Sequence, residues 1–88
     1  MRKYFSEFLG TLFLVFVIVA TGDPLAIGAA LALIAMVLGP ISGGHVNPAV
    51  TLALFSNNQV VKSDVMPYVL AQVVGGIAAL QLHKAVLN

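Results

Sequence analysis

No charged side chain occurs between Asp23 and Lys62, and a polar, glycine-rich turn interrupts this uncharged stretch. The turn reads Ser42-Gly43-Gly44-His45-Val46-Asn47-Pro48-Ala49-Val50-Thr51. Lipid offers no hydrogen-bond partners to such a backbone, so within a membrane the turn must be buried in protein or line a cavity. The turn is therefore the candidate functional region of the chain.

The composition of the chain is typical of a membrane protein. Of the 88 residues, 60% are hydrophobic and 8% are charged, and the mean hydropathy is +1.05. In soluble domains roughly a quarter of the residues are charged, so we expect this chain to be integral to a membrane. Its net charge of +1, without a basic patch, gives no indication of nucleic-acid binding.

The chain lacks the residue groupings that catalysis or metal binding requires. It contains no cysteine, and its two histidines and three acidic residues are far apart in the sequence. Neither a metal-ligand spacing nor a nucleophile with its base can be recognised. We therefore expect no enzyme, no metal site and no cofactor.

Three segments are long and apolar enough to cross a membrane as helices, at about 4–21, 25–39 and 64–87. The first is followed by Gly22-Asp23-Pro24, and the second ends at Gly39-Pro40, which are both turn-forming sequences. At about 1.5 Å per residue the first segment is ~27 Å long, close to the thickness of the hydrocarbon core. The fold class predicted is therefore an all-α membrane protein.

Small residues recur at a spacing of three or four on two of these segments. They are Gly28, Ala32, Ala35 and Gly39 on the second segment, and Ala71, Gly75 and Ala79 on the third. Small side chains allow helix backbones to approach closely in lipid. We expect both stripes to make helix contacts.

Residues at about 40–56 are predicted to form a re-entrant loop followed by a half-helix. Asn47 is a preferred N-cap residue, and Pro48 is preferred at the first helical position. The helix would be ~12 Å long, less than half the hydrocarbon thickness. The simplest path dips to mid-membrane, turns at Asn47 and returns to the side from which it came.

The N-terminus of such a half-helix presents unpaired N–H groups and a partial positive charge at mid-membrane. The Asn47 side-chain amide adds a hydrogen-bond donor, and the carbonyls of residues 43–46 add acceptors. Donors and acceptors in this arrangement favour a path for a neutral polar solute. A structural loop without conduction stays open as the alternative.

The distribution of basic residues predicts the orientation. With three spans, Arg2, Lys3 and Lys62 lie on one side of the membrane, and Lys84 lies on the other. The positive-inside rule then places the N-terminus in the cytoplasm. The bias is small enough to permit insertion in both orientations.

Three blocks of sequence carry a family resemblance. They are Glu7-Phe8-Leu9-Gly10-Thr11 with Leu14-Val15-Phe16, the segment from Ile41 to Thr51, and Tyr68-Val69-Leu70-Ala71-Gln72-Val73-Val74-Gly75-Gly76. Together they resemble the N-terminal half of an aquaporin or glycerol facilitator, the major intrinsic protein family. The resemblance implies three transmembrane helices plus one re-entrant half-helix, with residues 1–88 forming one half of the family's inverted repeat.

The resemblance also implies a pore in which two Asn-Pro-Ala half-helices meet at mid-membrane and exclude protons and cations. In this chain the motif is Asn47-Pro48-Ala49, with Asn47 as the donor to the permeating solute. The carbonyls along the pore would belong to Gly43, Gly44, His45 and Val46.

Two polar residues on the first and third spans are expected to support the loop. The resemblance implies that Glu7 is buried and braces the loop through hydrogen bonds, and that Gln72 bonds another helix or loop. A Glu7 side chain at the membrane interface, and a His45 that acts as a titrating gate, stay open as alternatives.

The chain departs from the family pattern at the selectivity filter. An arginine usually follows the second Asn-Pro-Ala of the family, whereas Val50 follows Ala49 here. The position that often supplies an aromatic ring falls near Ile27, and Pro40 stands where histidine is more frequent. A pore built from this sequence would therefore have apolar rings containing Ile27, Gly44 and Val50.

These observations predict a passive channel for water, and for glycerol or other small neutral solutes, assembled from two half-repeats. An antiparallel homodimer is favoured, while a second half from a separate chain and a truncated product are alternatives. The resemblance suggests an assembly with four pores. Two alternatives belong to other functional classes. One is a proton-coupled small multidrug-type transporter that uses Glu7, and the other is a non-conducting partner subunit of a full-length channel.

Overall fold

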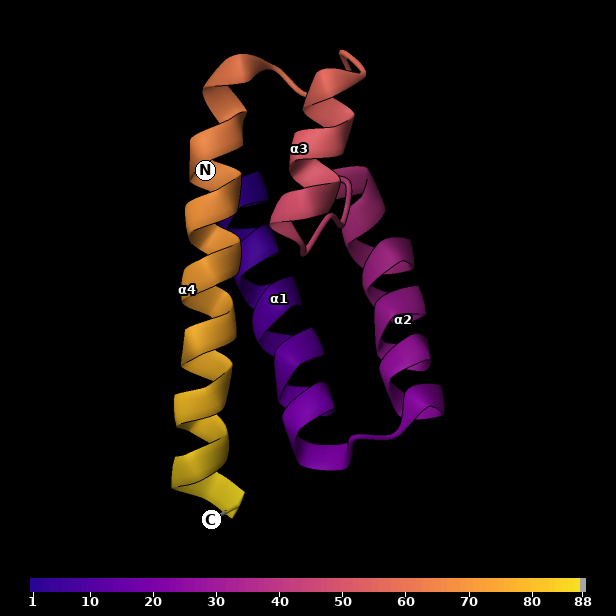
Figure 1. Ribbon diagram of the computed structural model, residues 1–88, viewed down its shortest axis with the longest axis vertical. Helices are drawn as coiled ribbons and strands as arrows, with labels where there is room; N and C mark the ends of the chain where they lie inside the picture. Colours follow the sequence, from indigo (N-terminus) through magenta and orange to yellow (C-terminus); the bar gives the residue numbers. More distant parts are fainter. Residues whose placement is uncertain (88) are drawn as a thin grey trace.

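The computed structural model describes residues 1–87, so Asn88 of the expected half-repeat lies outside the described residues. Its elements in chain order are α1 (Arg2–Thr21), α2 (Pro24–Ser42), α3 (Pro48–Ser56) and α4 (Lys62–Leu87) (Figure 1). By length and composition α1, α2 and α4 could each cross a membrane. The predicted fold class, three long apolar helices plus one short helix, is confirmed.

The reversal between α1 and α2 is made by the turn sequence itself. Gly22 caps the C-terminus of α1 in the left-handed conformation with φ of 58°, which costs glycine little. The Asp23 carboxylate then accepts a hydrogen bond of 3.0 Å from the backbone N–H of Leu25. Pro24 occupies the first helical position, where its missing N–H removes no hydrogen bond.

The second helix is longer than expected. We predicted its end at Gly39, but α2 continues through Pro40 to Ser42. Proline removes one hydrogen bond from a helix, and here the last turn is held by tertiary contacts of Ser42. Its hydroxyl donates to Glu7 and its carbonyl accepts from the Tyr68 hydroxyl. The helix ends at Gly43, whose φ of 93° requires glycine.

The three long helices pack with α1 in the central position. It contacts both α2 and α4, while α3 packs against α4 (Figure 1). The helices α1 and α4 approach each other closely at Gly75, where a Cβ atom would lie 2.5 Å from the carbonyl oxygen of Phe8. The small-residue stripe on α4 therefore makes the expected contact.

The stripe on α2 makes no comparable contact. A Cβ atom added at Gly28 or at Gly39 would meet nothing within 4 Å. Within residues 1–87 these two glycines touch no neighbouring helix, so the helix contact expected for this stripe stays a prediction. Small residues permit a close approach of another helix but do not require one. Among the described residues, α1 packs against a different face of α2, which includes Ile34 and Leu38.

Figure 1 shows the path of the re-entrant segment. After α2 ends, the loop of residues 43–47 turns back along the molecule, and α3 runs toward the end at which α4 begins. The N-terminus of α3 thus lies within the length of the long helices. Its other end, at Ser56, is on the same side as the end of α2.

Candidate functional site

The loop between α2 and α3 has backbone dihedral angles that do not occur in regular helices or strands. Gly43, Gly44 and Val46 all have positive φ, at 93°, 62° and 46°. This region suits glycine, but it strains a β-branched residue. Val46 is nevertheless buried, with 4% of its surface exposed, so the surrounding structure must hold it in place.

The side chain of Glu7, on α1, fixes the loop in this conformation through hydrogen bonds. One carboxylate oxygen accepts hydrogen bonds from the Ser42 hydroxyl at 2.7 Å and the His45 backbone N–H at 3.0 Å. The other accepts from the Val46 N–H at 2.8 Å and the Gln72 amide at 2.9 Å. With four donors, the carboxylate is fully buried, as an intramembrane acid requires.

A second group of hydrogen bonds connects the loop to α3 and α4. The Gln72 amide also donates to the Thr51 hydroxyl at 2.9 Å. The same hydroxyl lies 2.9 Å from Nδ1 of His45, whose ring centroid is 5.0 Å from that of Tyr68. Thr51 therefore links the loop, the half-helix and α4 through a single oxygen atom.

Two buried polar side-chain atoms have no hydrogen-bond partner among the described residues. They are the Thr11 hydroxyl and the carbonyl oxygen of the Gln72 side chain. Buried polar groups of this kind are usually satisfied by an ordered water.

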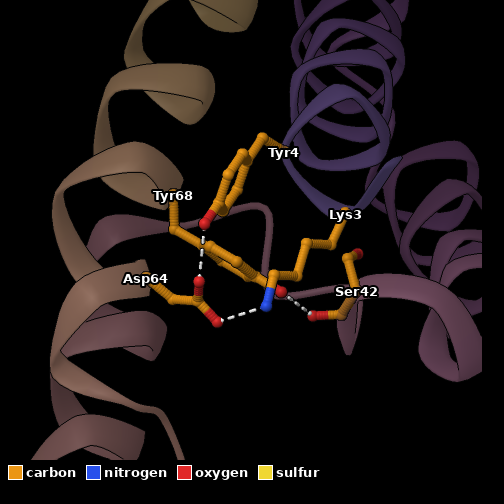
Figure 2. Close-up of polar contacts among 5 residues, drawn as sticks. All are labelled: Lys3, Tyr4, Ser42, Asp64 and Tyr68. Carbon is orange, nitrogen blue, oxygen red and sulfur yellow. Dashed lines mark hydrogen bonds and ion pairs between the residues drawn. The ribbon is translucent and has the colours of Figure 1, made fainter. Parts of the chain in front are cut away.

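A third cluster fastens α1 to α4 at the end of the molecule where the loop enters (Figure 2). Asp64 accepts hydrogen bonds of 2.7 Å from Nζ of Lys3 and from the Tyr4 hydroxyl. The Tyr68 hydroxyl donates to the Ser42 carbonyl, also at 2.7 Å (Figure 2). The loop is thus held from its flank as well as by Glu7.

Asn47 lies at the free end of α3. Its side-chain oxygen caps the helix by accepting from the Ala49 N–H at 2.8 Å, and Pro48 takes the first helical position. The residue is exposed, and its amide N–H₂ donates no hydrogen bond to any residue from 1 to 87. The helix end offers hydrogen-bond donors and a partial positive charge to whatever lies beside it.

The structure brings most of the expected site residues together and leaves one apart. Residues 43–50 form one continuous segment, and both Glu7 and Gln72 contact that segment or its helix. Ile27 is in the first turn of α2, which at 1.5 Å per residue is roughly 22 Å along the helix from Ser42. A ring of Ile27, Gly44 and Val50 therefore cannot form within one chain.

Several contacts of the site were not anticipated from the sequence. Thr51 was only the last residue of a motif, Asp64 was only the start of a span, and neither Lys3 nor Tyr4 was assigned to the loop's support. Asp64 lies 61 and 60 residues from its partners Lys3 and Tyr4 in the chain, so no local pattern indicates these contacts. Among residues 1–87, no three His, Cys, Asp or Glu side chains lie close enough together to hold a metal ion.

The fold and the loop define an integral membrane protein with a re-entrant half-helix. The sequence profile described as Major intrinsic protein matches residues 1–88. The chain is 49% identical over 97 aligned positions to glycerol uptake facilitator protein-like 6 of Lactiplantibacillus plantarum, covering 100% of this chain and 45% of that protein. It is 42% identical over 90 positions to aquaporin-5 of Sus scrofa and 41% over 92 to that of Homo sapiens, covering 89% of this chain and 34% of each relative.

The chain belongs to the major intrinsic protein family. It spans less than half the length of the curated relatives that it matches. The resemblance to the N-terminal half of a member of this family is confirmed, and the assignment of residues 1–88 to one repeat of an inverted pair stays a prediction.

Proposed function

We propose that the chain forms one half of a passive channel for water and for small neutral solutes such as glycerol. The observation that carries this proposal is the exposed N-terminus of α3 at Asn47, within the length of the membrane-spanning helices. Family membership supports the class of function. The relatives' names, which include glycerol uptake facilitator and aquaporin, indicate the solutes.

The chemistry of the loop suits a neutral hydrogen-bonding solute. Asn47 and the first N–H groups of α3 donate, and their positive potential disfavours cations. Among the described residues, no hydrogen bond ends on the carbonyls of Gly43, Gly44 or His45, so these groups are available to accept. A water molecule could exchange bulk hydrogen bonds for contacts along residues 43–47.

The second half of the pore is a second copy of the chain in the inverted orientation. The half-helix end is polar and exposed, and it needs a partner before lipid can surround the pair. In an inverted pair the two Asn47 side chains meet at mid-membrane, and Ile27 of one copy comes to the end that carries Gly44 and Val50 of the other. The N-terminus of at least one copy is cytoplasmic by the distribution of lysine and arginine.

The contacts of Glu7 do not favour a proton-coupled multidrug transporter. Both oxygens of the carboxylate are occupied by two donors each, and the side chain is fully buried. No surface remains for a substrate cation. A non-conducting subunit is the remaining alternative, and it would give no permeability in the experiment below.

Vesicles containing the purified chain should shrink faster than empty vesicles after an osmotic step, as measured by stopped-flow light scattering. Asn47→Leu should lower the added water permeability by about tenfold, because an unpaired hydrogen-bonding group in a dry path costs ~1–3 kcal/mol. Asp23→Leu removes an N-cap of the same kind from α2 and should leave permeability unchanged. Wild-type vesicles no faster than empty ones would exclude conduction by this chain alone.

A further inference from the structure

The two buried atoms without a hydrogen-bond partner belong to the two helices that pack most tightly. They are the hydroxyl of Thr11 on α1 and the side-chain oxygen of Gln72 on α4, and neither bonds any group of residues 1–87. Thr11 is 5% exposed and Gln72 is 2% exposed. Oxygen atoms buried to this degree are normally hydrogen-bonded, because burial removes them from bulk water. Each therefore needs a partner that the protein itself does not supply.

The orientation of the Gln72 amide group is fixed by the bonds that its nitrogen makes. The nitrogen donates to the Glu7 carboxylate and to the Thr51 hydroxyl, both at 2.9 Å. The reverse orientation would place the amide oxygen against the Glu7 carboxylate, which has no hydrogen to share with it. The oxygen therefore lies on the other side of the amide carbon, and it accepts from a donor other than Glu7 or Thr51.

Thr11 and Gln72 lie within one helical turn of each other along the contact between α1 and α4. The two helices run in the same direction (Figure 1). Gln72 bonds Glu7, which is one turn before Thr11 on α1. Thr11 in turn approaches Gly76, which is one turn after Gln72 on α4. A bridging water joins oxygens ~5 Å apart, because each of its hydrogen bonds is ~2.8 Å long, and this reach suits two side chains placed diagonally across such a contact.

Gly76 leaves room for a small molecule beside these side chains. A Cβ atom added there would lie 3.6 Å from a Val15 methyl and 4.0 Å from the Thr11 methyl, which are ordinary contact distances. The Cβ direction on a helix leans toward the N-terminus, so this room is on the side of the turn that carries Gln72. A water molecule, at about 30 Å³ in the liquid, is similar in size to the methyl group that would fit.

We propose that one water molecule is bound between α1 and α4, where it donates to the Gln72 side-chain oxygen and shares a hydrogen bond with the Thr11 hydroxyl. Water meets both requirements, because it donates to an oxygen that can only accept and it either donates to or accepts from a hydroxyl. By holding the Gln72 amide in the orientation that serves Glu7 and Thr51, the water stabilises the loop of residues 43–47. The site does not depend on conduction and belongs equally to a non-conducting chain.

Magnetic relaxation dispersion of the water oxygen nucleus counts the long-lived waters on the purified chain in detergent micelles. Thr11→Val replaces the hydroxyl by a methyl group of similar shape, and it should lower the count by about one water per chain. Thr11→Ser keeps the hydroxyl and should keep the wild-type count. Thr21→Val is the matched control, because it makes the same change at an exposed threonine of α1 whose hydroxyl donates to the Val17 carbonyl, and it should leave the count unchanged.

A second measurement needs no substitution. In the wild type we expect a nuclear Overhauser cross-peak between water and the α protons of Gly76, and none between water and the methyl group of Ala79, which is fully buried on the same helix. Equal water counts in wild type and Thr11→Val, or absence of the Gly76 cross-peak, would overturn the proposal. A wild type without a long-lived water, combined with loss of stability in Thr11→Val, would show instead that the Thr11 hydroxyl bonds the Gln72 oxygen directly.

Discussion

Glu7→Ala should lower the free energy of unfolding by about 4 kcal/mol or more, the largest effect that we expect from a single substitution. The alanine variant removes the acceptor of four hydrogen bonds, which are donated by Ser42, His45, Val46 and Gln72. Each unsatisfied donor costs ~1–3 kcal/mol. Denaturant unfolding of the purified chain in detergent micelles, followed by circular dichroism, measures the change.

Two further variants isolate the cause. Glu7→Gln keeps the shape of the side chain but turns an N–H₂ group toward hydrogen-bond donors. Its free energy of unfolding should therefore lie between that of the wild type and that of Glu7→Ala. Asp23→Ala removes an exposed carboxylate that accepts one hydrogen bond, and it should cost only ~1 kcal/mol. If Glu7→Ala were no more destabilising than Asp23→Ala, the carboxylate would not hold the loop.

Gly75→Ala should have the second largest effect, a loss of about 3 kcal/mol in the same unfolding measurement. The added Cβ would lie 2.5 Å from the Phe8 carbonyl oxygen and 3.3 Å from the Leu12 nitrogen. Both atoms belong to the backbone, so α1 and α4 must move apart to admit the methyl group. Overpacking of a tight contact costs ~1–3 kcal/mol, and here it also disturbs the helix that carries Glu7.

Gly28→Ala is the matched control for this prediction. It makes the same chemical change on α2, where the new Cβ atom meets nothing within 4 Å. We expect stability equal to or slightly above that of wild type, because alanine has the higher helix propensity. Equal effects at Gly75 and Gly28 would show that α1 and α4 do not pack as closely as the structure indicates.

Much of the fold could be predicted from the sequence because each long helix has a local signal. Long apolar runs with few charged residues predicted the three spans, and Gly22-Asp23-Pro24 and Asn47-Pro48 predicted a chain reversal and a helix start. The end of α2 was not predictable in this way. Pro40 indicates a helix end, but the hydrogen bonds of Ser42 to distant residues extend the helix past it.

The candidate site was predictable where it is continuous in sequence or where the family resemblance extends to it. Residues 43–50 are contiguous, and Glu7 and Gln72 were singled out from the resemblance, not from any spacing. The ion pair of Lys3 with Asp64 and the shared hydroxyl of Thr51 could not be foreseen. They depend on how α1, α3 and α4 are placed side by side, which helical periodicity does not specify.

Single-cysteine cross-linking tests most directly whether the half-helix end meets its inverted copy. The chain has no cysteine, so Ala49→Cys and Ser56→Cys each place one thiol, at the beginning and at the end of α3. In an inverted pair the two Ala49 positions are neighbours, and the two Ser56 positions lie on opposite sides of the membrane, roughly 25 Å or more apart. A short bifunctional thiol reagent should therefore link Ala49→Cys chains into dimers and leave Ser56→Cys chains as monomers. Dimers from Ser56→Cys, or none from Ala49→Cys, would contradict a pore formed by two inverted copies.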